Sequence, residues 1–220
     1  MKIVKFNKQK YPFHQIVQSL YDYKLESLDD SLDHSNGMLG MDTDSVWHNI
    51  FYDKLRSGWP ELINIYEAFI QDIIGPYFKD ETKLIYQATP GYRVNQPGGK
   101  AIYLAHCDGD ELHKHPNGEI NIFMPLTKAF GNNSIWIESI PGLGDYKAVE
   151  MEFGECLMFY GNRLRHSNNF NDTGKTRCSF DFRIIPPVNY DPSYRLGSAT
   201  KGHKFLVGSY YKEIEIKEAK

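Results

Sequence analysis

Residues 155–185 read ECLMFYGNRLRHSNNFNDTGKTRCSFDFRII and indicate the fold more clearly than any other stretch of the chain. They contain three β-rich runs: Glu155–Tyr160, Arg165–Phe170 and Thr176–Ile185. The runs are separated by Gly161-Asn162 and by Asn171-Asp172-Thr173-Gly174. Short connections of this composition form the tight turns of hairpins, so the stretch predicts three consecutive antiparallel strands.

The same alternation of short β-rich runs and turn residues begins near residue 83. The further candidate strands are Lys83–Gln87, Tyr92–Asn95, Ala101–Cys107, Ile120–Leu126, Ser134–Ser139 and Lys147–Phe153. Many short strands at close spacing favour a sandwich or jelly roll over a parallel sheet.

The first 82 residues carry a helical period instead. From Trp59 to Phe78, apolar residues recur at the three- and four-residue spacing of a helix with one buried face. Shorter helical patterns fit His14–Tyr23 and Ser45–Leu55, whereas Asp29–Asp44 is polar and Gly-bearing and predicts a loop.

We therefore expect an α+β, mainly β fold: a double-stranded β-helix (jelly roll, cupin-like) with a helical N-terminal region packed against it. The expected parts of this single domain are a helical support region at residues 1–82, a catalytic core at 83–188 and a tail at 189–220. The tail carries one apolar-aromatic cluster, Phe205–Tyr211, which we expect to pack on the core.

The composition excludes several classes of protein. A formal net charge of -3 provides no basic field to hold nucleic acid or an anionic membrane. The three cysteines form no CxxC pair, which is typical of free thiols in a reducing compartment. The chain shows neither a signal peptide nor a run of about 18 apolar residues. We expect a cytoplasmic protein that acts on a small molecule; the sequence does not indicate the oligomeric state.

Three residues form a candidate metal site. His106 and Asp108 lie where an expected strand runs into a polar loop, and residues i and i+2 of a strand share one face. His166 offers a second imidazole from the hairpin. Two imidazoles and one carboxylate make the facial triad of non-haem Fe(II) oxygenases, which leaves positions open for substrate and dioxygen. The alternative is a surface histidine, a turn-capping aspartate and a packed strand histidine.

Arg177 and Ser179 share one face of the strand that follows His166. An arginine makes two parallel charge-assisted hydrogen bonds to a carboxylate, and a neighbouring hydroxyl adds a third. The pair therefore suits the distal carboxylate of 2-oxoglutarate, although a surface ion pair is the alternative. Arg183 lies on the same face and is the other candidate anchor, unless it forms a structural ion pair with Asp181.

The order His-x-Asp, His and Arg-x-Ser resembles the Fe(II)/2-oxoglutarate-dependent dioxygenases with a double-stranded β-helix. More narrowly, the chain resembles the StrG-like, phytanoyl-CoA-dioxygenase-like bacterial subgroup associated with streptomycin biosynthesis and other secondary metabolism. The segments that carry this resemblance are Gly118–Asn121, Pro125–Thr127, Trp136–Ser139, Phe159–Asn162 and Ser179–Arg183. The resemblance covers roughly residues 92 to 187, and the helical N-terminal third matches only loosely.

The resemblance implies an oxidoreductase with Fe(II) on His106, Asp108 and His166, and with 2-oxoglutarate and O2 as co-substrates. The implied reaction oxidises, most simply hydroxylates, a C–H bond of a small polar metabolite such as a sugar-containing one, with succinate and CO2 as co-products. The same ligands also serve desaturation, ketone formation and epimerisation.

Further residues are expected around this centre. Asn121 would hydrogen-bond the C1 carboxylate of 2-oxoglutarate or the substrate, and the alternative is a structural amide. The candidate substrate contacts are Arg93, Trp136, Glu138 and His113. The loop after Asp108 is longer than the subgroup's pattern, so Asp110 remains an alternative carboxylate ligand. Asp108 is favoured because its side chain converges with that of His106 without distorting the backbone.

Two other functions fit parts of the same sequence. His113, His115 and Glu119 spell the HxHxxxE core of a cupin motif, and with His166 they would form a site for Mn, Fe, Ni or Zn. That site would serve an isomerase or a 2-oxoglutarate-independent dioxygenase, but it leaves Arg177 and Ser179 without a role. The second alternative is a jelly-roll binding module without catalysis, in which the histidines are structural.

Overall fold

Two antiparallel sheets face each other in the computed structural model, which describes residues 1–29, 45–99, 104–197, 202 and 204–216. The large sheet has the order β1-β7-β4-β9-β2-β10, and β3 also pairs with β9. Its strands are β1 (Lys2–Lys5), β2 (Lys83–Gln87), β3 (Gly91–Asn95), β4 (Ile120–Pro125), β7 (Glu155–Phe159), β9 (Arg177–Ile185) and β10 (Tyr211–Glu215). The small sheet has the order β6-β5-β8, with β5 at Ile135–Ile137, β6 at Lys147–Ala148 and β8 at His166–Asn168. The expected jelly roll is confirmed.

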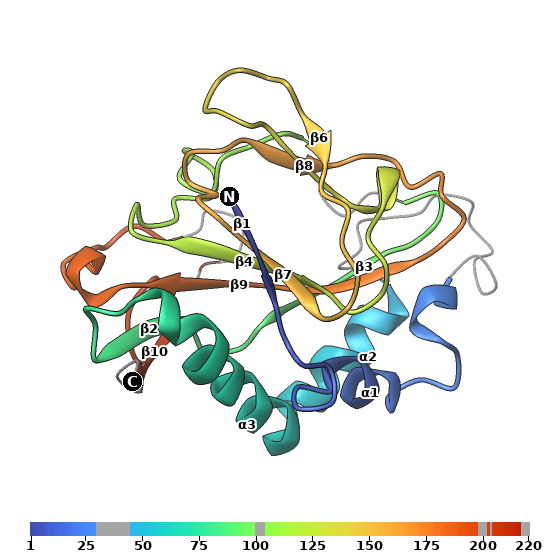
Figure 1. The fold of residues 1–220 in the computed structure, drawn as a ribbon, viewed down its shortest axis with the longest axis horizontal. Coiled ribbons are helices and arrows are strands. Elements are labelled where there is room, and N and C mark those ends of the chain that lie inside the picture. Colours follow the sequence, from blue (N-terminus) through green and yellow to red (C-terminus); the bar gives the residue numbers. More distant parts are fainter. Residues whose placement is uncertain (30–44, 100–103, 198–201, 203, 217–220) are drawn as a thin grey trace.

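The helices cover the face of the large sheet opposite the small one (Figure 1). They are α1 (Phe13–Gln18), α2 (Val46–Arg56) and α3 (Pro60–Phe69). The Ser45 hydroxyl caps α2 by accepting a hydrogen bond from the backbone N–H of His48, and Pro60 begins α3 where no N–H is needed. The chain continues from α3 through a π-helical turn, Ile70–Ile74, and a 3-10 turn, Gly75–Tyr77. Shorter 3-10 turns lie at Leu25–Ser27, Gly131–Asn133 and Pro187–Asn189.

The main core lies between the helices and the large sheet, and its aromatic rings come from both. Phe51 of α2 stacks on Tyr92 of β3, with ring centroids 4.3 Å apart, and Tyr66 of α3 meets Phe182 of β9 edge to face at 4.9 Å. All four rings are buried.

Strand β9 has an apolar face and a polar face. Cys178, Phe180, Phe182 and Ile184 belong to the helix-covered core. Because side chains alternate along a strand, Arg177, Ser179, Asp181 and Arg183 point the other way, toward the small sheet. The functional site is built on that face.

The structure corrects several expected boundaries. The expected strand Ala101–Cys107 is only partly described, and residues 104–107 contribute a single bridge, between His106 and His166. The expected strand Lys147–Phe153 ends at Ala148, and Met151 makes only an isolated bridge with Ala129. Most of the expected loop, residues 30–44, lies outside the described residues.

Two strands were not expected. β1 pairs with β7 and β10 pairs with β2, each at an edge of the large sheet. Both are short and largely exposed, so neither shows a long apolar run in the sequence. Phe205, before β10, and Tyr211, its first residue, are buried against Ile85 and Ile185. Within the described ranges, no helix combines the length and apolarity needed to cross a bilayer.

Candidate metal centre

His106 and His166 lie side by side because their backbones are paired. Each donates its N–H to the other's carbonyl oxygen, at 3.1 Å from His106 and 2.9 Å from His166. The two residues are therefore directly opposed across an antiparallel bridge, and their imidazole centroids are 4.6 Å apart. His166 is further fixed by β8, where it pairs with Ile137 of β5.

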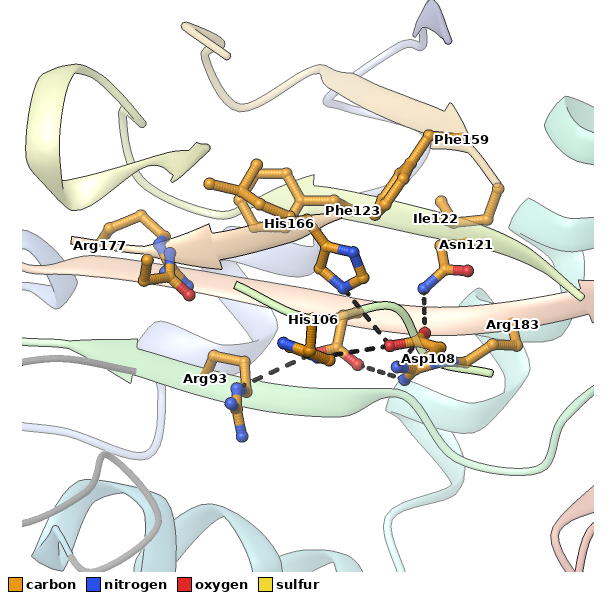
Figure 2. A pocket seen from close by; sticks show the side chains of 13 residues that line it. Arg93, His106, Asp108, Asn121, Ile122, Phe123, Phe159, His166, Arg177 and Arg183 are labelled. Carbon is orange, nitrogen blue, oxygen red and sulfur yellow. Dashed lines mark hydrogen bonds and ion pairs between the residues drawn. The ribbon is translucent and has the colours of Figure 1, made fainter. Parts of the chain in front are cut away.

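Asp108 completes the cluster from the loop after His106. Its backbone N–H donates to the Gly161 carbonyl at 3.0 Å, which anchors the loop beside the turn before β8. The carboxylate oxygen Oδ1 lies 3.6 Å from Nε2 of His106 and 3.4 Å from Nε2 of His166 (Figure 2). All three side chains are buried, and their ligand atoms lie within 4.8 Å of one another.

The hydrogen bonds of the two imidazoles direct the same nitrogen toward the carboxylate. Nδ1 of His106 lies 3.0 Å from the Leu104 carbonyl, and Nδ1 of His166 lies 3.0 Å from the Leu164 carbonyl. Because a carbonyl only accepts, each Nδ1 carries the donated proton and Nε2 faces the cluster. Metal-binding histidines are commonly oriented by such a second bond. Two imidazole nitrogens and one carboxylate oxygen on one side of a cavity fit a divalent ion of the first transition row.

The electrostatics of the cluster favour a cation. Burial acts to raise the pKa of the Asp108 carboxyl, but Arg183 and then His166 outweigh it and hold that pKa well below its usual range. Burial acts to lower the pKa of His166, whereas the Asp108 carboxylate raises it, and the net pKa lies above the ordinary histidine value. The carboxylate is therefore ionised, and a metal ion bound at Nε2 of His166 would take the place of a proton on that nitrogen.

The pocket that His106, Asp108 and His166 line is bounded by both sheets. His166 and Asn168 of β8 and Ile135 of β5 line it from the small sheet, while residues of β3, β4, β7 and β9 line it from the large one. Arg177 is among them and is buried. Its Nη1 donates to the Ser179 hydroxyl at 2.6 Å and its Nε to the Asn133 carbonyl at 2.9 Å. The structure thus brings the expected carboxylate anchor and the three expected ligands to one cavity.

Asn121 and Arg183 also line this pocket, and both contact Asp108. The Asn121 amide nitrogen donates to Oδ2 of Asp108 at 2.6 Å, and Nη2 of Arg183 lies 3.0 Å from the same oxygen. Nη1 of Arg183 pairs with Asp181 at 2.7 Å, which is the structural ion pair considered from the sequence. The amide expected to bind 2-oxoglutarate is therefore turned toward the metal-site carboxylate.

Only some of the substrate contacts expected from the sequence line the pocket. Arg93 lines the pocket, and its Nε lies 3.8 Å from Asp181. Trp136 does not line it: Ile135 and Ile137 are the buried residues of β5, and the Trp136 indole donates to the Gly131 carbonyl. Glu138 does not line it either, because its carboxylate accepts the backbone N–H groups of Arg165 and Gly144.

In the loop after Asp108, His113 does not lie where a substrate contact would be expected, and Asp110 does not lie where a metal ligand would be expected. His113 stacks on the His106 ring, with centroids 4.3 Å apart, and its Nδ1 lies 2.7 Å from Asp110 rather than facing the pocket. Asp110 also accepts the backbone N–H groups of Leu112 and His113. Of the two candidate carboxylates, the structure places Asp108 between the histidines.

The four residues of the cupin alternative are not brought together. His115 and Glu119 lie near Asp108, as a second group within 4.8 Å, while His166 belongs to the first group. Nδ1 of His115 lies 2.8 Å from one oxygen of Glu119, and the other oxygen accepts from the Tyr211 hydroxyl. Both oxygens of this buried carboxylate therefore have protein partners.

Other pocket residues were not singled out from the sequence. Asp181 was considered only as an ion-pair partner, and Ile135, Asn168 and Phe159 were not considered as pocket residues. Strand alternation indicates that Asp181 and Arg183 share the face of Arg177. The contact of Arg183 with Asp108 depends on how strands that are distant in sequence are aligned. A local sequence pattern does not predict that alignment.

Comparison with known proteins adds a relative and two structural neighbours. The chain is 33% identical over 174 residues to the streptomycin biosynthesis protein StrG of Streptomyces griseus, covering 79% of this chain and 78% of that protein. No protein-family model matches it. The structure of the non-haem α-ketoglutarate-dependent carbocyclase SnoK from nogalamycin biosynthesis shares the fold, with TM-score 0.51, 14% identity and coverage of 69% and 71%. EctD from S. alaskensis, solved with bound Fe, does so with TM-score 0.54, 14% identity and coverage of 90% and 74%.

Proposed function

This chain belongs to the family of the streptomycin biosynthesis protein StrG, and we propose that it is an Fe(II)- and 2-oxoglutarate-dependent oxygenase. The observation that carries the proposal is the shared pocket of His106, Asp108 and His166 with Arg177. The chain shares its fold with SnoK, which is described as non-haem and α-ketoglutarate-dependent, and with EctD, which was solved with bound Fe, and this supports the proposal.

The three proposed ligands would hold the metal in the pocket. His106 and Asp108 come from the segment after residue 104 and His166 from β8, and all three line the pocket. That arrangement leaves coordination positions for a keto acid and for dioxygen. When bound, Fe(II) with 2-oxoglutarate and O2 supplies the oxidant for a substrate C–H bond, with succinate and CO2 as co-products.

Arg177 is the proposed anchor for the distal carboxylate of 2-oxoglutarate. Its guanidinium is held by Ser179 and by the Asn133 carbonyl, and it lies 5.5 Å from the centroid of the Phe123 ring. A buried, pre-oriented guanidinium binds a carboxylate strongly because little rotational freedom is lost and water is excluded. Ser179 would orient Arg177 by accepting its hydrogen bond, whereas this hydroxyl was expected from the sequence to bond the carboxylate of 2-oxoglutarate directly.

The proposed substrate is a small polar metabolite, with sugar-containing compounds as the first class to test. The family relation to a streptomycin biosynthesis protein supports this class. The pocket supports it too, because its wall combines the charged side chains of Arg93 and Asp181 with the Phe159 ring. Hydroxylation is the proposed outcome, since it requires the fewest steps after C–H cleavage.

An anaerobic titration of metal-free protein tests the proposal. Fe(II) and then 2-oxoglutarate are added, and the visible charge-transfer band of an iron-chelated keto acid is followed. We expect the band in the wild-type protein, its loss in His166→Ala and its retention in His115→Gln. Arg177→Ala should need a much higher 2-oxoglutarate concentration to form the band, because losing a buried charge pair costs about 2–5 kcal/mol. Iron binding without the band, dependent on His115 instead of His166, would overturn the proposal.

A further inference from the structure

We propose that Arg183 and Asn121 are positioning residues that leave only one oxygen of Asp108 available to the metal. The inference rests on the proposed function and deepens it. It assigns Arg183 to the metal ligand and excludes it as the 2-oxoglutarate anchor.

The two oxygens of Asp108 have different surroundings. Oδ2 lies 2.6 Å from the amide nitrogen of Asn121 and 3.0 Å from Nη2 of Arg183. Oδ1 faces the two imidazoles, at 3.4 Å and 3.6 Å from their Nε2 atoms. Only 3% of the Asp108 side chain is exposed, so solvent cannot readily replace either donor. Figure 2 shows the carboxylate held between these two sets of neighbours.

The two donors are themselves held in place. Asn121 of β4 is directly opposite Arg183 of β9 in the sheet register, so their side chains emerge together on the pocket face. Asp181 fixes the other half of the Arg183 fork at 2.7 Å. The Asn121 carbonyl accepts the backbone N–H of Gly161 at 3.1 Å, which determines which end of the amide faces Asp108.

This arrangement controls how Asp108 can coordinate. A carboxylate free to turn can offer both oxygens to a metal and would then occupy a position that the keto acid or dioxygen needs. With Oδ2 taken by two donors, one charged, Asp108 is limited to monodentate binding through Oδ1. Ligating carboxylates depend on such hydrogen bonds for orientation, and removing an outer partner typically weakens metal binding about 10–100-fold.

Arg183 and Arg177 therefore have different tasks on the same face of β9. Both η nitrogens of Arg183 contact protein carboxylates, whereas Nη1 of Arg177 donates to a hydroxyl and its Nε donates to a backbone carbonyl. Loss of Arg183 should weaken the metal, and loss of Arg177 should weaken 2-oxoglutarate.

Two binding constants separate the roles. Fe(II) affinity is measured anaerobically on metal-free protein by competition with a chromophoric chelator, and 2-oxoglutarate affinity is measured with Fe(II) saturating. We expect Arg183→Gln to lose about 10–100-fold in Fe(II) affinity with little change for 2-oxoglutarate. Arg177→Gln should show the reverse. Arg56→Gln, which removes the exposed ion pair with Asp53, is the matched control and should change neither.

The behaviour of Arg183→Gln decides the inference. Unchanged Fe(II) affinity in Arg183→Gln overturns it, and so does a selective loss of 2-oxoglutarate affinity in that variant. If Arg183→Gln does not fold by circular dichroism, Asn121→Ala removes the other donor to the same oxygen and must show the weakened Fe(II) binding. Failure of the wild-type protein to bind Fe(II) at His106 and His166 would instead contradict the proposed function itself.

Discussion

At the scale of single residues, the chemistry of this site depends on which atoms of each side chain are already engaged. Backbone carbonyls take Nδ1 of both histidines, and Asn121 and Arg183 take Oδ2 of Asp108. The atoms that remain, two Nε2 and one Oδ1, converge on one point. Each of the three residues has two possible ligand atoms, and the surrounding hydrogen bonds leave one of the two available to a metal.

Gly161 gives a prediction at this scale. A Cβ at this position would lie 2.6 Å from the amide atoms of Asn121, closer than side-chain packing allows. Gly161→Ala should therefore displace Asn121 and weaken Fe(II) binding, which chelator competition measures. Gly109→Ala is the matched control, because its Cβ would meet Asn162 at an ordinary 3.5 Å. Equal Fe(II) affinities in the two variants would show that the Asn121 contact is dispensable.

At the scale of elements, β9 connects the site to the core. Its pocket face carries Arg177 and Arg183, for which we propose separate roles, and its other face carries Phe180 and Phe182 in the helix-covered core. Packing of the core face fixes the position and direction of β9. This in turn fixes the positions of the side chains on its pocket face. β4 works in the same way, with Asn121 on the pocket side and Met124 in the core.

Phe180→Ala tests this division of faces. Phe180 is fully buried and its ring centroid lies 5.8 Å from those of Phe13 and Phe51. We expect a loss of about 3–5 kcal/mol in the free energy of unfolding, measured with urea, because the cavity left cannot collapse fully. The half-exposed Phe170 serves as the control and should change stability little when replaced by Ala. A Phe180→Ala protein as stable as the wild type would contradict this packing.

The sequence predicted the parts of the fold and site that depend on local pattern. Periodicity of two identified the strand Thr176–Ile185 and the shared face of Arg177 and Ser179, and periodicity of three to four identified the long helical segment. Trp136 and Glu138 were wrongly predicted to lie in the pocket. Which face of β5 points toward the pocket depends on how β5 packs against strands that are distant in sequence. The partners of Asp108 were not predicted because they depend on the register of β4 against β9.

At the scale of the whole molecule, the two sheets and the helices have separate functions. The helices bury one face of the large sheet, and the small sheet faces the other (Figure 1). Side chains from both sheets line the pocket. The C-terminal segment packs beside the loop that follows Asp108, where Phe205 packs on the His115 ring and Tyr211 donates to Glu119. The loop that carries Asp108 is thereby held between the core and the segment that includes β10.

The central claim is that this closed fold holds one metal ion between His106, Asp108 and His166. Anomalous diffraction from crystals soaked anaerobically with Fe(II) tests it most directly. We predict one strong peak between the two Nε2 atoms and Oδ1 of Asp108, with Oδ2 still bonded to Asn121 and Arg183. A peak between His115, Glu119 and Asp108 instead, or no ordered peak at saturating Fe(II), would contradict the account.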